Sequence, residues 1–218
     1  MIIAIDGPAG SGKSSVAKEV AKKLGLTYID TGAMYRALTL KALENNINLD
    51  DENKLNTLLE SIEIKLIPNT EKDILEIFVN DEDVTESIRK PEVSNSVSLV
   101  AKHANIRELM VKKQRDFSKI QKNIIMDGRD IATVVFPNAE LKVFLTASVE
   151  ERANRRFKEL CEKGLDTKLE DLIKEIQQRD EIDTKRENSP LKEAKDSIIL
   201  DTTSLSFEEV VNKIISLT

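Results

Sequence analysis

Residues 7–14 read Gly7-Pro8-Ala9-Gly10-Ser11-Gly12-Lys13-Ser14, which fits the pattern G-x-x-x-x-G-K-S/T at every fixed position. The apolar run from Ile2 to Ile5 predicts a buried strand before it, and apolar residues from Val16 to Leu24 recur at helical spacing after it. Strand, glycine-rich turn and helix in this order predict a P-loop, where backbone N–H groups and a helix N-terminus surround a phosphate. A glycine-rich turn that binds nothing is the alternative, and the lysine and serine in their expected places disfavour it.

The polar side chains of this loop suit a nucleoside triphosphate. Lys13 supplies a mobile cation for the β- and γ-phosphates, and the Ser14 hydroxyl can ligate Mg²⁺. Ser15 offers a second hydroxyl, so the sequence leaves open which serine contacts the metal.

Two absences favour phosphoryl transfer over hydrolysis. The nearest match to the guanine-specific string Asn-Lys-x-Asp is Asn53-Lys54-Leu55-Asn56, which lacks the aspartate. Many ATPases place a glutamate, which activates water, directly after the Walker-B aspartate at the end of a core strand, whereas Asp127 is followed by Gly128. A kinase must avoid activating water, so both absences fit a kinase.

The remaining apolar runs predict an α/β fold. Short strands are expected at Tyr28–Ile29, Ile124–Met126, Leu141–Leu145 and Ile198–Leu200, and they alternate with segments of helical spacing. This rhythm is typical of a parallel sheet with helices on both faces.

One segment departs from that rhythm. Apolar and charged residues alternate from Ile62 to Leu66, a turn cluster follows at Pro68-Asn69-Thr70, and a β-rich run spans Ile74–Val79. The pattern predicts a hairpin inserted into a helical stretch. Further on, the helical phase changes, which predicts a break near Ala104–Asn105.

Composition excludes several classes of protein. The 218 residues carry a net charge of −6 with no basic stripe, which argues against a duplex-binding protein. One cysteine and one histidine exclude a disulfide framework and a Cys- or His-rich metal site. No targeting segment or membrane-spanning apolar run is visible, so we expect a cytoplasmic protein.

Arginines follow several of these elements and suit an anionic acceptor. A phosphate acceptor that attacks a triphosphate needs fixed cations, and the arginine fork binds phosphate oxygens bidentately. Arg36 lies early in a predicted helix, and Arg129 follows a predicted strand at the ligand-binding edge of the sheet. Spacings of four and three predict one shared helix face for Arg179, Asp183 and Arg186. Another face, after a capping box of Ser148 and Glu151, carries Arg152, Arg155 and Arg156; for Arg152 an ordinary salt bridge remains an equal alternative.

From Ile3 to Ile215 the sequence resembles the bacterial cytidylate kinases. The P-loop stretch is generic, whereas four others in this order are specific to that family. They are Asp30-Thr31-Gly32-Ala33-Met34-Tyr35-Arg36; Asp127-Gly128-Arg129-Asp130; Glu150-Glu151-Arg152-Ala153 with Arg155-Arg156; and Arg179-Asp180 through Asp183 and Arg186 to Ser189-Pro190-Leu191. Two departures keep the chemistry: Thr31 stands where many members have serine, and Ser14-Ser15 replaces a frequent Gly-Thr pair.

The resemblance implies a P-loop nucleoside-monophosphate kinase fold, with a five-stranded parallel sheet in the order 2-3-1-4-5. A core domain would comprise residues 1–30, 86–150 and 187–218. Residues 31–93 would bind the acceptor nucleotide and carry the small antiparallel insert at about 62–85. Residues 151–186 would form a short lid with its flanking helices.

The resemblance also implies a reaction, in which the γ-phosphoryl group of ATP passes to CMP or dCMP with Mg²⁺ as cofactor. Catalytic roles fall to Lys13, Arg36, Arg129 and Arg179. ATP would be bound by Gly7, Pro8, Ala9, Gly10, Ser11, Gly12, Lys13, Ser14, Ser15, Arg155 and Arg156, the last two in the lid. CMP would be bound by Thr31, Arg36, Ser98, Arg107, Arg129, Asp130, Arg179, Asp183 and Arg186. Ser14 would ligate Mg²⁺ together with phosphate oxygens and waters. The expected partners are these small molecules alone, without nucleic acid or membrane, and the family implies a monomer.

Cytosine chemistry supports this division of roles. Ser98, Arg107, Asp130 and Arg186 are implied to contact the base, which offers an amino donor at N4 and acceptors at N3 and O2. A carboxylate or hydroxyl suits the donor, and guanidiniums suit the acceptors. Uracil would leave the buried Asp130 unpaired, which disfavours it.

Two other functions stay open at this point. One is another small-molecule P-loop kinase, such as an adenylate, uridylate or shikimate kinase, which the Asp127-Gly128-Arg129-Asp130 stretch and the β insert disfavour. The other is a nucleotide-regulated binding protein without turnover, which Lys13 and the acceptor-side arginines disfavour. The sequence does not distinguish CMP from dCMP.

Overall fold

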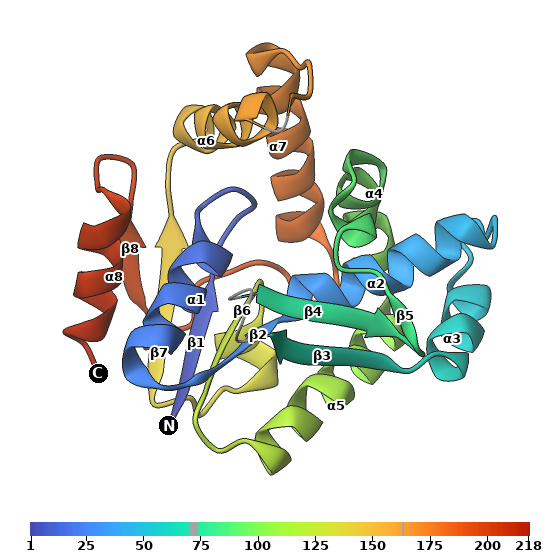
Figure 1. Ribbon diagram of the computed structural model, residues 1–218, viewed down its shortest axis with the longest axis horizontal. Coiled ribbons are helices and arrows are strands. Elements are labelled where there is room, and N and C mark those ends of the chain that lie inside the picture. The colour runs from blue at the N-terminus through green and yellow to red at the C-terminus, as the bar shows by residue number, and fades with distance from the viewer. Residues whose placement is uncertain (70–73, 163) are drawn as a thin grey trace. The chain divides into compact units, whose positions relative to one another are not determined.

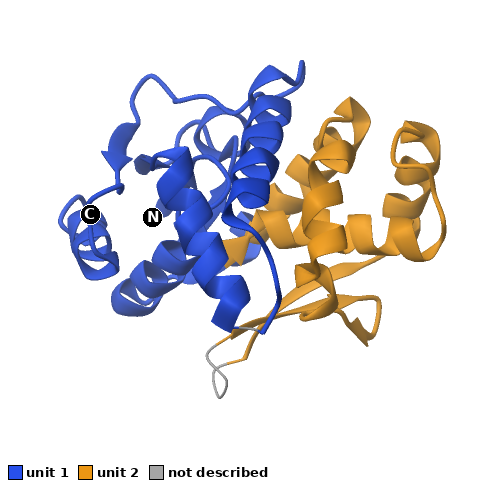
Figure 2. Cartoon of the chain, turned by 90° about the horizontal axis from the view of Figure 1, so that it is seen from above, with its two compact units in different colours: residues 1–28, 118–218 blue, residues 29–117 orange. Residues whose placement is uncertain are grey.

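The computed structural model of the chain describes residues 1–69, 74–162 and 164–218. Its contacts divide the chain into two compact units (Figure 2). Unit 1 comprises Met1–Tyr28 and Ser118–Thr218, and unit 2 comprises Ile29–Phe117. Each unit has its own apolar core and is described by itself.

A five-stranded sheet forms the centre of unit 1 (Figure 1). Its strands lie in the order β2-β6-β1-β7-β8, which is 2-3-1-4-5 when these five strands are counted along the chain and confirms the expected order. The pairs β1–β6, β1–β7 and β7–β8 are parallel. The strands are β1 (Ile2–Asp6), β2 (Thr27–Asp30, whose last two residues belong to unit 2), β6 (Ile124–Gly128), β7 (Leu141–Thr146) and β8 (Ile198–Asp201).

Four helices accompany this sheet: α1 (Lys13–Leu24), α6 (Val149–Glu162), α7 (Leu169–Lys185) and α8 (Phe207–Ile215). The apolar face of α1 packs with α8 and with inward-facing strand residues; Val16, Val20, Ile5, Val143 and Val211 belong to this core. Gly25 ends α1 in the left-handed conformation, which is typical of glycine at a helix C-terminus. A short π-helical turn, η2 (Ile131–Val135), follows β6 and was not predicted.

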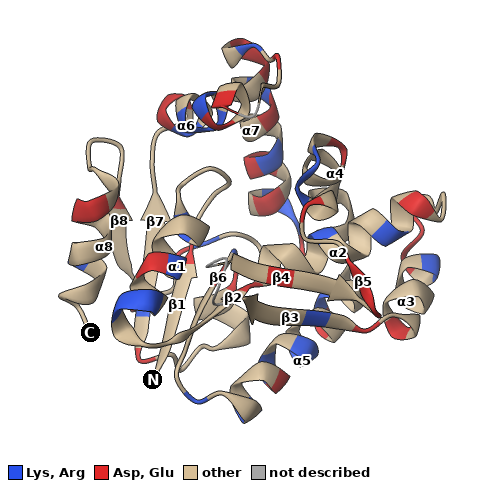
Figure 3. Ribbon diagram, in the orientation of Figure 1, with Lys and Arg blue, Asp and Glu red and all other residues tan. Residues whose placement is uncertain are grey.

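The helices α6 and α7 pack against each other over a small core of their own. Ala153 and Leu160 of α6 meet Leu172 and Ile176 of α7. Outside this seam both helices carry charged residues of both signs (Figure 3). Lys163, in the connection between them, lies outside the described residues. The predicted lid therefore consists of a packed helix pair with a polar exterior.

Unit 2 combines helices with the predicted β insert. Its elements are α2 (Thr31–Glu44), α3 (Glu52–Ser61), β3 (Ile64–Asn69), β4 (Ile74–Val79), β5 (Glu82–Asp83), the 3-10 turn η1 (Ser87–Arg89), α4 (Pro91–Ala101) and α5 (Ala104–Ile120, whose last three residues belong to unit 1). The three strands form an antiparallel sheet in the order β3-β4-β5, and Thr70 of the predicted turn cluster lies outside the described residues. The helices enclose an apolar core that includes Met34, Leu38, Leu55, Ile88 and Ile106.

The interruption between α4 and α5 falls at residues 102–103, just before the predicted break. The contacts group α4 and most of α5 with unit 2, whereas the sequence-based division placed residues 94–117 in the core domain. The functional division into core, acceptor and lid regions stays a prediction. Among the described residues, no helix is both long and apolar enough to span a bilayer.

Candidate functional site

The P-loop connects β1 to α1, and its glycines are required by the backbone. A Cβ atom on Gly7 would overlap the carbonyl oxygen of Leu145 in β7, so no side chain fits there. Gly12 has a φ of 88° at the N-cap of α1, in the left-handed region that glycine adopts without steric cost. The predicted strand–loop–helix context is present.

Lys13 is the most confined cation of the loop, with 5% of its surface exposed. Its ammonium donates to the Pro8 carbonyl at 2.6 Å and to the Ser11 hydroxyl at 3.3 Å. Burial, together with Arg129 and Arg179, holds the pKa of Lys13 well below its usual value. Lys13, Arg129 and Arg179 therefore repel one another electrostatically, and an anion bound beside Lys13 would relieve this repulsion.

Two oxygen-bearing side chains beside the loop could hold a divalent cation. The Ser14 hydroxyl donates to Asp127 Oδ2 at 2.8 Å, and the Tyr28 hydroxyl donates to Oδ1 at 2.9 Å. Mg²⁺ prefers oxygen ligands and usually needs one or two from the protein, with phosphates and waters completing the octahedron. The Ser14–Asp127 pair is chemically compatible with that requirement.

An ionic cluster joins the end of β6 to α7. Arg129 Nε donates to Asp183 Oδ2 at 2.8 Å, and Arg186 NH1 lies 3.8 Å from Asp183 Oδ1. Burial opposes ionisation of Asp183, but Arg129, Arg179 and Arg186 outweigh it and lower the pKa of that carboxyl. Burial likewise opposes the charge of Arg129, and Asp183 raises the pKa of that guanidinium. Asp183 thus fixes several cations in place.

Arg186 lies at the C-terminal end of the predicted helix face. The helix ends at Lys185 and Arg186 is its C-cap, but the Arg186 amide still donates to the Ile182 carbonyl at 3.1 Å in the helical pattern. Its Nε donates to the Ser189 carbonyl at 2.8 Å. At the predicted spacing of three, its NH1 lies 3.8 Å from Asp183 Oδ1.

Asp6 ends β1 and holds the backbone that follows β6. Its two carboxylate oxygens accept from the amides of Ile131 and Ala132 at 2.8 and 2.7 Å. Burial raises the pKa of Asp6 to about 7 against these two hydrogen bonds, which lower it. The bonded amides directly follow Asp130, which is buried and begins η2. Asp6 therefore fixes the backbone that carries Arg129 and Asp130.

The arginines of α6 have different surroundings. Arg155 donates to Glu151 at 2.9 Å and to the Thr202 carbonyl at 2.7 Å, with the Ser11 carbonyl of the P-loop at 3.5 Å. Arg156 pairs with Glu159 at 2.9 Å on the helix surface. Arg152 is buried and pairs with Asp180 at 2.6 Å, which realises the salt-bridge alternative. At the start of α6, Ser148 accepts from the Glu151 amide as a cap.

Within unit 2, Asp30 organises the first turn of α2. Its carboxylate accepts from the Ala33 amide at 2.8 Å as an N-cap, and Arg36 NH2 donates to it at 2.9 Å. Thr31 begins the helix and is buried. The pair with Asp30 fixes the predicted phosphate-binding Arg36 at the helix start.

The predicted base-contacting residues of unit 2 lie on α4 and α5. Ser98 and Arg107 are both buried, the latter with 3% exposed surface. Arg107 NH1 donates to the Ala101 carbonyl at 3.1 Å, and its guanidinium lies over the Tyr35 ring at 5.5 Å from the centroid. A buried, oriented guanidinium is available as a donor in this unit.

The predicted residues thus divide between the units. Unit 1 brings Lys13, Arg129 and Arg179 together and places Asp183 and Arg186 beside them. Unit 2 holds Thr31, Arg36, Ser98 and Arg107. Sequence reasoning missed Asp6 and Tyr28: a strand-ending aspartate before the P-loop was the only signal for the first, and nothing marked the second.

The family-model comparison matches the cytidylate kinase family over residues 3–218. The chain belongs to the cytidylate kinase family. It is 56% identical over 213 residues to the cytidylate kinase of Bacillus subtilis, a match covering 98% of this chain and 94% of that protein. The cytidylate kinase of Listeria welshimeri is 56% identical over 215 residues, 99% of this chain and 94% of the relative. That of Halalkalibacterium halodurans is 54% identical over 215 residues, 99% of this chain and 96% of the relative.

Solved structures are similar in fold. An uncharacterised protein from Eubacterium ventriosum has a TM-score of 0.54 at 12% identity, covering 100% of this chain and 97% of that one. A gluconokinase from Sinorhizobium meliloti has a TM-score of 0.50 at 14% identity, covering 98% and 89%. At these identities the likeness bears on the fold alone, and it agrees with a P-loop kinase architecture.

Proposed function

We propose that this cytidylate kinase family member transfers the γ-phosphoryl group of ATP to CMP or dCMP, giving ADP and CDP or dCDP. The observation that carries the proposal is the buried Lys13 of the P-loop, whose ammonium is held by the Pro8 carbonyl and the Ser11 hydroxyl; burial, with Arg129 and Arg179, lowers its pKa. Buried cations repel one another unless an anion joins them, and transferring phosphoryl groups are such anions. Family membership supplies the class of acceptor.

Positioning and charge neutralisation account for the chemistry. In this scheme the P-loop amides and Lys13 hold the β- and γ-phosphates, while Arg36, Arg129 and Arg179 bind the acceptor phosphate and the transferring group. The acceptor oxygen is already anionic near neutral pH, so no general base is needed. No covalent intermediate is expected, because two aligned phosphates can react directly.

Mg²⁺ would be held by the Ser14 hydroxyl, with Asp127 accepting the hydrogen bond of that hydroxyl at 2.8 Å or acting through a water. When bound, the metal would neutralise charge on the β- and γ-phosphates. Tyr28 donates to the other carboxylate oxygen of Asp127, which limits its rotation. These residues suit a magnesium–nucleotide complex rather than a free protein-bound ion.

Base selection would fall to buried groups. Asp130 and Ser98 suit the N4 amino donor of cytosine, while Arg107 and Arg186 suit its O2 and N3 acceptors. Asp183 would contact the ribose with Arg179. ATP would be covered by Arg155 and Arg156 of the lid. We also propose that the chain acts as a monomer with small molecules as its only partners.

A coupled assay of ADP release tests the proposal, with ATP and Mg²⁺ against CMP, dCMP, UMP, AMP and shikimate. CMP and dCMP should give the highest kcat/KM. Lys13→Ala, the matched inactive variant, should lower kcat about a hundredfold or more with its circular dichroism unchanged. A higher kcat/KM with another acceptor would show that the chain is a kinase for that acceptor. Absence of CMP-dependent ADP release would favour a nucleotide-binding protein without turnover.

A further inference from the structure

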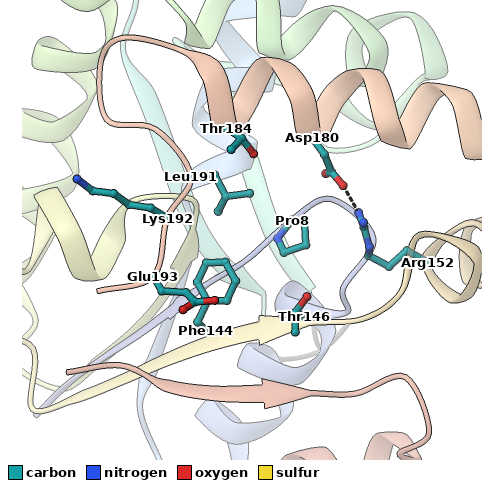
Figure 4. A pocket seen from close by; sticks show the side chains of 9 residues that line it. All are labelled: Pro8, Phe144, Thr146, Arg152, Asp180, Thr184, Leu191, Lys192 and Glu193. Carbon is teal, nitrogen blue, oxygen red and sulfur yellow. Dashed lines mark ion pairs between the residues drawn. The ribbon is translucent and has the colours of Figure 1, made fainter. Parts of the chain in front are cut away.

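The guanidinium of Arg152 lies where three segments of unit 1 meet. Its Nε donates to the Ala147 carbonyl at 3.0 Å, between β7 and α6. Its NH1 donates to the Ala9 carbonyl of the P-loop at 2.9 Å and pairs with Asp180 Oδ2 of α7 at 2.6 Å. This pair lies at one edge of a cavity of about 460 Å³ that Pro8 of the P-loop also lines (Figure 4).

The P-loop backbone lies directly against α6 at this point. A Cβ atom on Gly10 would lie 3.1 Å from the Cβ of Arg152, which is tighter than ordinary contact. Arg152 itself is only 4% exposed. A displacement of Arg152 would therefore shift the Ala9–Gly10 backbone rather than be absorbed by solvent.

Both ends of this link lie beside predicted phosphate-binding cations. Asp180 directly follows Arg179 in α7. Ala9 directly follows Pro8, whose carbonyl accepts from Lys13 at 2.6 Å. Arg152 thus connects the backbone that holds Lys13 to the helix turn that holds Arg179, and these two cations act on one locus.

We propose that Arg152 and Asp180 are positioning residues for phosphoryl transfer: they hold the P-loop and α7 in register so that Lys13 and Arg179 meet the same phosphates. This inference rests on the proposed function. Arg152 does not contact the nucleotide in this arrangement; its fork spans two carbonyl groups and one carboxylate. A lysine has a single point of charge and cannot reach all three.

The test uses three variants: Arg152→Lys, Asp180→Asn and the double variant that combines these two changes. Glu181→Gln is the matched control. Glu181 is the next residue of α7, and its pair with Lys185 is exposed. Steady-state kinetics with ATP and CMP, thermal unfolding and amide hydrogen exchange without nucleotide are measured for each. Arg152→Lys should lower kcat about tenfold to a hundredfold and raise KM for ATP several-fold, because small displacements of reacting groups are costly.

Asp180→Asn keeps the Arg152–Ala9 bond, so it should lower kcat about tenfold with KM for ATP within about twofold. The double variant should be about as slow as Arg152→Lys alone, because both changes disrupt the same ion pair. In Arg152→Lys, exchange should quicken in peptides covering residues 7–13 and 176–183, and Glu181→Gln should match the wild type in every measurement.

Unchanged kcat in both single variants, with only the unfolding temperature lowered, would show a purely structural pair. A raised KM for ATP in Arg152→Lys with a silent Asp180→Asn would indicate direct contact with ATP. Either result overturns the inference. If the wild type does not phosphorylate CMP, the proposed function fails. The exchange data then test by themselves whether Arg152 holds the P-loop and α7 in register. Unchanged exchange in Arg152→Lys would refute this positioning role, and faster exchange in both peptides would support it.

Discussion

Buried charged groups make up most of the candidate site in unit 1, and each is held by another charge or by backbone. Lys13 is held by two P-loop oxygens, Asp183 by Arg129, and Asp6 by two amides. Isolated charges are costly to bury, so networks of this kind persist where their cost is offset by fixed geometry. At the residue scale, the site consists of charged side chains that are held by specific partners. Replacing one of these side chains should change either the free energy of unfolding or a kinetic constant.

Asp6 gives a pH-dependent prediction. Burial raises its pKa to about 7, from 3.8 in the unfolded chain, against two backbone hydrogen bonds. Because the folded state holds this proton more tightly, its contribution to stability is full below about pH 4 and is lost as the pH rises through about 7. The contribution is on the order of 4 kcal/mol.

Urea unfolding of the wild type and Asp6→Asn between pH 4 and 8 measures this effect. Asparagine does not titrate, so the free energy of unfolding of the wild type minus that of the variant should fall between about pH 4 and about pH 7 and level off above 7. Titrating groups that do not interact with Asp6 cancel in the difference, whereas Lys13 and Asp130 interact with it directly. A difference independent of pH above 5 would mean that the hydrogen bonds from Ile131 and Ala132 outweigh burial and keep Asp6 ionised.

Asp130 gives a specificity prediction. If its buried carboxylate accepts from cytosine N4, Asp130→Ala should raise KM for CMP by about tenfold to a hundredfold, corresponding to roughly 1–3 kcal/mol, and leave KM for ATP nearly unchanged. Initial rates over a matrix of both substrates separate the two constants. An unchanged KM for CMP with a lower unfolding temperature would assign Asp130 a structural role at the start of η2.

At the scale of elements, apolar periodicity predicted the five strands and most helices, because burial on a sheet or helix face leaves a regular signal. The strand order came from the resemblance to the family. It could not predict η2, which depends on Asp6 reaching amides 125 and 126 positions along the chain. The P-loop residues were predictable from a local motif, whereas the partners of Arg152 and Asp127 come from distant segments.

The start of α8 tests a local signal. Ser206 accepts from the Glu209 amide at 3.3 Å, and Glu209 accepts in return from the Ser206 amide at 2.8 Å, which completes a capping box. Because α8 packs on α1, Ser206→Ala should lower the free energy of unfolding by about 1 kcal/mol without changing kcat. Urea unfolding measures the loss.

Ser216→Ala is the matched control at the other end of α8. The Ser216 hydroxyl donates only to the exposed Lys213 carbonyl at 2.7 Å, so its loss should cost less than that of the cap. Equal losses at both ends would mean that general helix content, and not the cap, stabilises α8. A change in kcat in Ser206→Ala would show that this helix end affects the site.

At the scale of the whole molecule, the residues predicted to bind ATP and those predicted to bind CMP are distributed differently over the two units. Every residue predicted to bind ATP belongs to unit 1, including the P-loop, Arg155 and Arg156. The residues predicted to bind CMP belong to both units: Arg36, Ser98 and Arg107 to unit 2, and Arg129, Asp130 and Asp183 to unit 1. The two nucleotides should therefore have different effects on the units.

Hydrogen exchange with each nucleotide alone and with both tests this division. A non-hydrolysable ATP analogue should slow exchange in the P-loop and α6 of unit 1, because a ligand suppresses opening of the structure that binds it. CMP should slow exchange in α2 and α4 of unit 2 and also in residues 128–135 of unit 1. Both ligands together should add protection in residues 151–186, the predicted lid with its flanking helices, since phosphates must react away from water. Protection by CMP confined to one unit would refute the acceptor residues assigned to the other. Protection by both ligands confined to the P-loop would instead mean that the predicted lid does not close.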